Sequence, residues 1–394
     1  MPKILRIINR FNLGGPTYNV ALLSKYMPPV YETLLIGGLK DESEASSDHI
    51  VDSLGLKPII IPTMRRSINP LNDIKAFIEL VKIIKKYKPD IVHTHAAKSG
   101  TLGRLAAWYC RVPIIVHTFH GNVFHSYFGR IKTTIFKFIE RWLAAKSTAI
   151  IAISIKQKEE LVQLHHIADA SKITIIPLGF DLTKFQLDMP QKRQRFRSQY
   201  NIDDETIAIG IIGRLVPVKN HPFFLKVIHS LQKQTSKKIR AFIVGDGESK
   251  PALVEMAGSL GLLDQKAEIN GPKVTFTSWI KDIDVVLAGL EIVCMTSFNE
   301  GTPVSLIEAQ AAGKSIVSTK VGGIEDITLV NQTSFLADVG DEELFVSHLV
   351  TLCENPTYRD MGHQLGWNFV KDKFHYTRLI NDMDKLYQNL LQNC

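Results

Sequence analysis

Short apolar runs rich in Val and Ile recur along the first 180 residues, and each is followed by a longer segment with apolar residues at helical spacing. This alternation predicts parallel strands joined by crossover helices. The predicted strands are 4–10, 32–37, 58–62, 90–95, 113–120, 149–154 and 173–178. Because runs such as AIIAIS are apolar on both faces, we expect helices on both sides of the sheet, as in a doubly wound fold.

The same alternation restarts after a polar stretch, 181–197, which we interpret as a linker. The strands predicted for the second half are 207–214, 240–244, 274–277, 291–297, 315–320 and 334–337. The sequence therefore predicts an α/β protein with two doubly wound parallel-sheet domains, 1–180 and 181–375. A last segment, 376–394, has helical spacing, and we expect it to pack back toward the first domain.

Composition is that of a soluble globular protein, with 45% hydrophobic and 22% charged residues in a chain of 394. The four cysteines have no paired spacing, so neither a disulfide framework nor a zinc site is expected, and a reducing cytoplasm fits best. No run approaches the roughly 20 apolar residues that span a bilayer, and the first apolar run is too short for a signal peptide. We therefore expect a cytoplasmic protein that is soluble or, at most, peripheral to the membrane.

The positive charge belongs to the first half of the chain. Residues 1–180 hold 24 Lys and Arg against 13 Asp and Glu, whereas 181–394 hold 23 against 26. Segments 80–88 and 130–146 combine basic and apolar residues at helical spacing. Such segments are typical of interfacial helices on an anionic membrane and equally of helices that cover a sheet. Two interpretations of this charge therefore remain open: peripheral contact with an anionic membrane, and a positive face that is simply solvated. Binding of nucleic acid is less favoured than either.

The most informative stretch is FNEGTPVSLIEAQAAGKSIVST at 298–319. A strand ends there at a polar loop that opens a helix near Pro303, and Glu300 and Glu308 flank the junction. Ligands bind at the carboxyl ends of strands in open α/β sheets, and a helix N-terminus with free N–H groups favours a diphosphate. Gly301 before Pro303 suits that geometry. One carboxylate would accept hydrogen bonds from a transferred sugar and the other from a ribose.

Two cations follow the first predicted strand of the second half. Arg214 and Lys219 lie on a loop that we expect to face the same pocket as Glu300. A departing nucleoside diphosphate develops negative charge, which preorganised cations stabilise. The sequence offers no Asp-x-Asp and no plausible His/Asp metal cluster, so we expect neither a metal nor another cofactor.

These segments together resemble the retaining GT-B glycosyltransferases of family 4. EGTPVSLIEAQAAGKSIVSTKVGG is similar to the family's E-x7-E signature, and GRLVPVKNH to its GRL-x-x-x-K element. Three further segments also match: NLGGPTYNVALLS at 12–24, HTHAAKSGTLGRLAA followed by VHTFHG, and IPLGFDLTKF at 176–185. The resemblance covers most of the chain. The segments HTHAAKSGTLGRLAA and VHTFHG are similar to those of the family's polysaccharide-assembly branch.

The resemblance implies two facing domains and a sugar moved from a nucleoside-diphosphate donor, UDP-linked in our interpretation, to a lipid-linked or glycan acceptor of surface polysaccharide. It also implies that cations replace a metal at the diphosphate and that His120 contacts the transferred sugar. The expected catalytic residues are His120, Arg214, Lys219 and Glu300. The expected donor-binding residues are Gly14, Gly15, Gly245, Gly247, Trp279, Gly301, Thr302, Pro303, Val304, Ser305 and Glu308.

Some of these assignments keep an alternative. Gly14 and Gly15, and Gly245 and Gly247, follow predicted strands and let a backbone approach a phosphate, yet each pair also fits a plain tight turn. His93 and His95 point to one face of a strand without a third ligand, so a metal site there is not expected. A non-hydrolysing sugar-nucleotide 2-epimerase and a non-catalytic nucleotide-sugar-binding partner of a membrane assembly are the competing functions.

Overall fold

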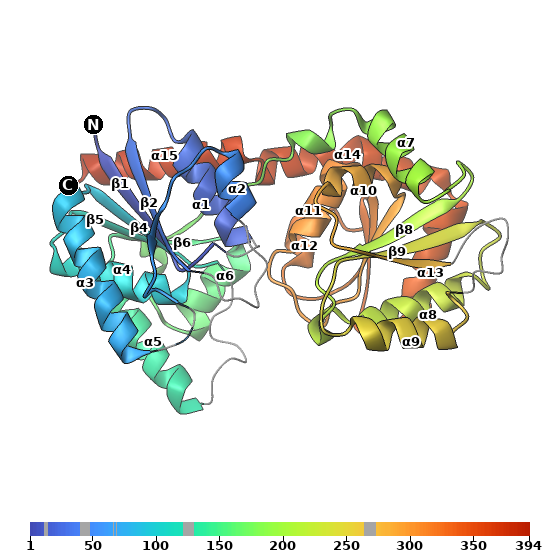
Figure 1. Ribbon diagram of the computed structural model, residues 1–394, viewed down its shortest axis with the longest axis horizontal. Helices are drawn as coiled ribbons and strands as arrows, with labels where there is room; N and C mark the ends of the chain where they lie inside the picture. The colour runs from blue at the N-terminus through green and yellow to red at the C-terminus, as the bar shows by residue number, and fades with distance from the viewer. Residues whose placement is uncertain (12–14, 40–47, 66, 68, 121–129, 264–272) are drawn as a thin grey trace. The chain divides into compact units, whose positions relative to one another are not determined.

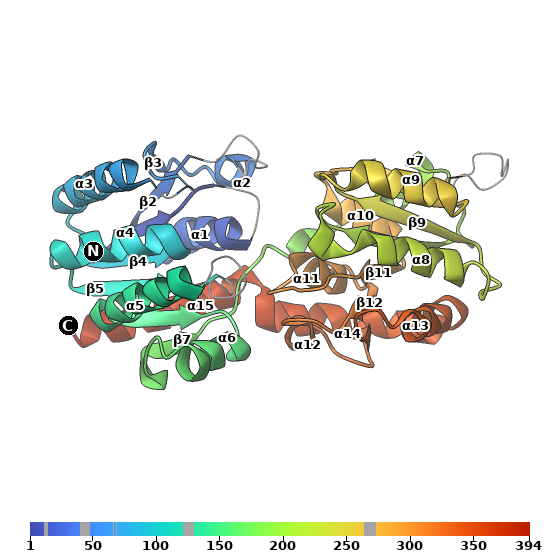
Figure 2. The ribbon, with the colours of Figure 1, turned by 90° about the horizontal axis from the view of Figure 1, so that it is seen from below.

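The computed structural model covers residues 1–394 and describes all of them except 12–14, 40–47, 66, 68, 121–129 and 264–272. The chain forms two compact units, Met1–Phe180 together with Phe374–Cys394, and Asp181–Lys373. Each unit has one parallel sheet between layers of helices (Figures 1 and 2). The predicted α/β class with two doubly wound parallel sheets is confirmed.

The first unit has a seven-stranded sheet in the order β3-β2-β1-β4-β5-β6-β7. Its strands are β1 (Lys3–Ile8), β2 (Glu32–Gly38), β3 (Ile59–Ile61), β4 (Ile91–His95), β5 (Ile114–Thr118), β6 (Ala149–Ala152) and β7 (Ile173–Ile175). Its helices are α1 (Gly15–Tyr26), α2 (Asp48–Ser53), α3 (Pro70–Tyr87), α4 (Ala97–Tyr109), α5 (Arg130–Lys146), α6 (Ile155–Glu159) and α15 (Tyr376–Gln392). The strand order reverses between β1 and β4, the point where such sheets bind ligands.

The second unit has a six-stranded sheet in the order β10-β9-β8-β11-β12-β13. Its strands are β8 (Ile207–Ile212), β9 (Ile239–Val244), β10 (Val274–Ser278), β11 (Ile292–Met295), β12 (Ser315–Thr319) and β13 (Ser334–Ala337). Its helices are α7 (Met189–Gln199), α8 (His221–Leu231), α9 (Lys250–Ser259), α10 (Ile283–Gly289), α11 (Val304–Ala311), α12 (Ile324–Ile327), α13 (Glu342–Glu354) and α14 (Pro356–Phe374). Here the reversal lies between β8 and β11, so their following loops emerge side by side.

The predicted linker at 181–197 is wrong. Its second half belongs to α7, which packs against α10, and it buries Phe196 and Arg197. The Arg197 guanidinium donates to the Gly289 carbonyl at 3.2 Å and to the Glu291 carboxylate at 3.1 Å. The polar composition of this helix reflects its exposed face, while its buried side chains pack it into the second unit.

The C-terminal helix α15 is part of the first unit. Leu379, Met383 and Tyr387 pack in one buried cluster with residues of β1, β4 and β5. The Tyr31 hydroxyl, just before β2, donates a hydrogen bond of 2.7 Å to Asp384 of α15. The helix thus covers the same face of the sheet as α1, with which it is in contact.

Candidate functional site

The loops after β8 and β11 are joined by backbone hydrogen bonds. Phe298 N–H donates to the Val218 carbonyl at 2.8 Å, and the Thr296 hydroxyl lies 3.0 Å from the carbonyls of Lys219 and Asn220. Because β8 and β11 are adjacent parallel strands, both loops leave the same edge of the sheet. The predicted diphosphate-binding loop and the predicted sugar-binding loop therefore lie together.

Lys219 and Glu300 form the centre of this arrangement. Lys219 Nζ lies 2.6 Å from Glu300 Oε1, and the Ser297 hydroxyl donates to the same oxygen at 2.5 Å. The side chains are only 24% and 10% exposed, so screening by water is weak. No described residue donates to Glu300 Oε2, which leaves that oxygen to accept hydrogen bonds from a ligand.

Two glycines after β12 hold the backbone of this loop. A Cβ at Gly322, whose φ is +58°, would lie 1.7 Å from the Glu300 carbonyl oxygen, and one at Gly323 would lie 2.5 Å from that of Gly301. Only glycine permits so close a backbone approach. The sequence analysis assigned no role to Ser297, Gly322 or Gly323. The pair of glycines directly after a predicted strand was the signal that could have indicated the last two.

The helix N-terminus at α11 is as predicted. α11 begins at Val304 after Pro303, and no side chain caps its first turn. Gly301 is exposed, and Thr302, Val304 and Ser305 are partly exposed. The first-turn N–H groups and the positive end of the helix dipole can therefore bind an anion.

Arg214 is exposed on the loop after β8 and forms no ion pair with any carboxylate that the structure describes. Its loop is braced by the turn after β9. Leu215 N–H donates to the Asp246 carbonyl, and Ser249 N–H donates to the Leu215 carbonyl, both at 3.0 Å. A guanidinium held this way on a fixed backbone can bind a diphosphate.

Gly245 and Gly247 form that turn. A Cβ at Gly245, with φ of +146°, would lie 1.9 Å from the Gly213 carbonyl oxygen, and one at Gly247 would lie 2.4 Å from that of Leu215. Close packing against the loop of Arg214 is thus a sufficient reason for both glycines. Trp279 follows β10 beside this turn, where Gly245 N–H donates to the Ser278 carbonyl at 3.1 Å, and its ring is exposed.

Glu308 lies on α11, partly buried, and no described residue donates a hydrogen bond to its side-chain carboxylate. Burial raises the pKa of Glu308 to about 7, with Lys184 opposing that shift and Asp284 adding to it. A carboxyl group that is costly to ionise in the free protein gains most from a ligand that donates hydrogen bonds to it.

His120 and the glycines of the first loop belong to the other unit. His120 lies two residues beyond the end of β5, and its Nε2 is 2.8 Å from Nδ1 of His95. Burial lowers the pKa of His120 to about 3, so the ring is neutral. Gly15 begins α1, where a Cβ would lie 3.2 Å from Leu178, and Gly14 lies outside the described residues.

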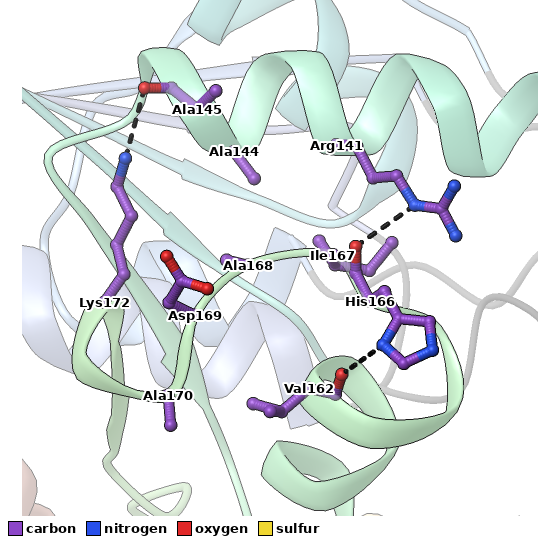
Figure 3. Close-up of a pocket in the computed structure, with 10 residues that line it drawn as sticks. All are labelled: Arg141, Ala144, Ala145, Val162, His166, Ile167, Ala168, Asp169, Ala170 and Lys172. Atoms are coloured by element: carbon purple, nitrogen blue, oxygen red, sulfur yellow. Dashed lines mark hydrogen bonds between the residues drawn. The ribbon is translucent and has the colours of Figure 1, made fainter.

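A surface pocket of about 660 Å³ lies elsewhere in the first unit, between α5 and the segment 162–172 (Figure 3). Its polar groups already bind main-chain carbonyls: Arg141 donates to His166, and Lys172 to Ala145, each at 3.1 Å. It contains none of the predicted site residues. In the part of the chain that the structure describes, no three His, Cys, Asp or Glu side chains are grouped as a metal site.

Two family models match the chain. The model "Glycosyl transferases group 1" matches residues 192–366, and "Glycosyltransferase Family 4" matches residues 33–184. An *Escherichia coli* protein named UDP-Gal:alpha-D-GlcNAc-diphosphoundecaprenol alpha-1,3-galactosyltransferase is 28% identical over 89% of this chain and 88% of its own. The *Staphylococcus aureus* capsular polysaccharide biosynthesis glycosyltransferase CapM is 25% identical over 84% and 85%.

Solved structures agree in fold. HepE of *Anabaena*, in complex with UDP, has a TM-score of 0.79 at 18% identity and covers 98% of this chain and 100% of its own. A glycosyltransferase from *Rickettsia africae* has a TM-score of 0.80 at 19% identity, covering 100% and 99%. Among the described helices, none has both the length and the apolar character needed to cross a bilayer.

Proposed function

Because the chain belongs to the GT-B glycosyltransferases of family 4, we propose that it moves a hexose from a UDP-sugar to a polyprenyl-diphosphate-linked saccharide during surface polysaccharide assembly, with retention of anomeric configuration. The single observation that carries the proposal is the Lys219–Glu300 pair beside the uncapped N-terminus of α11. The names of the *E. coli* and *S. aureus* relatives and the UDP bound to HepE support the choice of donor and acceptor.

The donor's diphosphate is bound by Arg214, Lys219 and the first N–H groups of α11. Glu300 accepts hydrogen bonds from hydroxyls of the transferred sugar through its free oxygen, and Glu308 accepts them from the ribose. Both carboxylates are acceptors that a polyhydroxylated ligand satisfies, and Lys219 keeps Glu300 ionised and oriented. Trp279 and the backbone at 276–280 contact the base.

The bond between the anomeric carbon and the phosphate oxygen breaks, and its electron pair stays on UDP. Arg214 and Lys219 stabilise that growing negative charge without a metal ion, and they do so in a fixed geometry. The acceptor hydroxyl attacks from the face that the phosphate leaves, and the departing phosphate takes its proton. Because burial keeps His120 neutral, that ring places no positive charge beside the sugar while the sugar itself becomes cationic.

A chelator-treated donor panel tests the reaction. The purified protein is screened with UDP-, GDP- and ADP-hexoses by thermal shift, since ligands that bind only the folded state raise its unfolding temperature. The responding donor is then incubated with a synthetic polyprenyl-diphosphate-linked GlcNAc in EDTA. We expect UDP release and an α-linked disaccharide. An epimerised, still-activated sugar, or tight donor binding without transfer, would support the competing functions instead.

We also propose that the enzyme contacts an anionic membrane through α3, α4 and α5. Trp108 and Trp142 are 43% and 38% exposed and stack edge to face at 5.2 Å, with Lys146 within 6.0 Å of both rings. On the same helices Phe138 is 69% exposed. Exposed aromatic rings beside lysines are what an interfacial surface presents to anionic lipid.

Sedimentation with vesicles tests this contact. Wild-type protein is expected to bind vesicles containing phosphatidylglycerol and not pure phosphatidylcholine, and the double variant Phe138→Ser/Trp142→Ser is expected to lose that binding. Leu344→Ser, at an apolar position of the second unit about as exposed as Trp142, is the control and should bind as the wild type does. Unchanged binding of the double variant would reject this surface while leaving the transfer reaction untouched.

A further inference from the structure

Three histidine rings form a row on one face of the first unit's sheet. His93 and His95 alternate to the same side of β4, with ring centroids 4.1 Å apart, and His120 lies 5.1 Å beyond His95. His93 and His95 are fully buried. His117 on β5 faces the opposite side, where its ring contacts Gly100 of α4 and hydrogen-bonds Thr94. The row therefore runs toward His120 and excludes His117.

The inner end of the row is anchored by α15. Arg6 Nη1 donates to the Tyr387 hydroxyl at 2.9 Å, and that hydroxyl lies 2.6 Å from His93 Nδ1. Because the tyrosine oxygen already accepts from arginine, its proton is free to go to Nδ1. His93 then carries its own proton on Nε2 and donates it to Thr118 at 2.8 Å. His93 is thus fixed in one tautomer and one orientation, and it supports the ring of His95.

The outer end is the contact between His95 Nδ1 and His120 Nε2, 2.8 Å apart. Burial lowers the pKa of His120 to about 3 and holds that of His95 well below its ordinary value, with His93 and His120 adding to the latter. Both rings are therefore neutral near pH 7, and a single proton lies between the two nitrogens. No described residue bonds Nδ1 of His120, which is buried.

We infer that His95 is a positioning residue for His120: it accepts the Nε2–H of His120 and so leaves an unprotonated Nδ1 on that ring. The inference rests on the proposed function. Transfer passes through a sugar with positive charge at its anomeric carbon, and a nitrogen lone pair stabilises that charge whereas an N–H group opposes it. A ring free to exchange tautomers would present the wrong group part of the time. By accepting at Nδ1, His95 favours the tautomer of His120 that carries its proton on Nε2.

Two substitutions separate hydrogen bonding from packing. His95→Asn keeps an amide oxygen near the position of Nδ1, so it can still accept from His120, whereas His95→Phe fills the space without an acceptor. We expect His95→Phe to lower kcat about tenfold, the loss of one hydrogen bond, and His95→Asn to recover most of that loss. KM for the UDP-sugar should stay unchanged in both, because the second unit holds the diphosphate.

The tautomer itself is read from the ¹⁵N chemical shifts of His120 in the ligand-free protein. We expect a protonated Nε2 in wild type and His95→Asn, and a mixture of tautomers in His95→Phe. His117→Phe is the matched control: the same change at an equally buried ring on the other face, expected to leave kcat unchanged. Unfolding temperatures are measured for all variants, so that rates are compared where each is folded.

The outcomes distinguish this inference from the proposed function. Should the wild type transfer no sugar, the proposed function fails, and the ¹⁵N shifts still report the proton of His120. A proton found on Nδ1 of His120 in the wild type overturns the inference alone. So does a His95→Phe enzyme with wild-type kcat, or a His117→Phe enzyme that loses as much kcat as His95→Phe.

Discussion

Lys219 and Glu300, 81 residues apart in the chain, form an ion pair of 2.6 Å between two neighbouring loops of the second unit. A third loop, after β12, supports the pair from behind through Gly322. The Glu300 carboxylate thereby has a cation and a hydroxyl donor on one oxygen, and no described residue donates to the other. The following predictions test the parts of this arrangement.

Ser297→Ala removes the hydroxyl that donates to Glu300 Oε1. A hydrogen bond to a charged group contributes about 1.5–3 kcal/mol, so we expect a loss in kcat of about tenfold or more, with a smaller change in unfolding temperature. Steady-state kinetics with saturating donor measure it. Ser318→Ala removes a comparably buried hydroxyl on β12 that bonds only a main-chain carbonyl, and it should leave kcat near the wild-type value.

Gly322→Ala places a Cβ against the Glu300 carbonyl and should displace the loop that carries the carboxylate. Gly340→Ala is the matched control, because Gly340 also has a positive φ, +88°, yet a Cβ there meets nothing within 4 Å. Both pay the left-handed backbone strain of about 1–2 kcal/mol, and only Gly322→Ala should lose activity strongly. Equal activities in the two variants would show that the close packing of Gly322 against the Glu300 carbonyl is not needed for activity.

Glu308→Gln tests the raised pKa. Below about pH 4.5 the carboxyl is protonated in both folded and unfolded chains, so the substitution should not change stability there. Above pH 7 the folded chain must hold an ionised Glu308 that burial disfavours, so the variant should unfold at a higher temperature than the wild type. Wild-type donor affinity should fall as pH drops below 7, and that pH dependence should disappear in the variant. Calorimetry measures both.

Arg104 and Glu140 join α4 to α5 by a fully buried ion pair of 2.6 Å. Replacing one partner leaves an uncompensated charge, so Arg104→Met is expected to lower the free energy of unfolding by about 3–5 kcal/mol. The double variant Arg104→Met/Glu140→Leu should recover most of that loss. Urea denaturation of the two variants gives the comparison, and a double variant less stable than the single one would contradict it.

The strands were predictable because their β-branched, apolar runs are buried on both faces. The predicted strands 4–10 and 113–120 nevertheless extend past the real ends of β1 and β5, at Ile8 and Thr118, since the loop residues that follow are also buried. The segment 181–197 shows the opposite case: its polar residues predict a linker, whereas its second half forms the largely exposed helix α7. The pattern of hydrophobic residues indicates which residues are buried, but a buried residue can lie in a strand, a helix or a loop.

The sequence predicts on which loops most of the candidate site residues lie, but not which of them are in contact. Arg214, Lys219 and Glu300 lie on the loops after β8 and β11, as the sequence predicts, and Glu308 lies on α11. That Lys219 meets Glu300 depends on β8 lying next to β11, a strand order that local sequence does not carry. Ser297 and Gly322 make their contacts across loops, and the contact between His95 and His120 joins the end of β4 to the loop after β5. Such contacts follow from topology.

The central claim is that Lys219 and Glu300 bind the reacting end of a UDP-sugar. The turnover number of Lys219→Ala and of Glu300→Ala, at saturating donor and acceptor in EDTA, tests it most directly. Lys226→Ala, an exposed lysine on α8, serves as the control. We predict losses of about 100- to 1,000-fold in the first two variants, with unchanged unfolding cooperativity, and none in the third. Wild-type turnover in both Lys219→Ala and Glu300→Ala would contradict the claim.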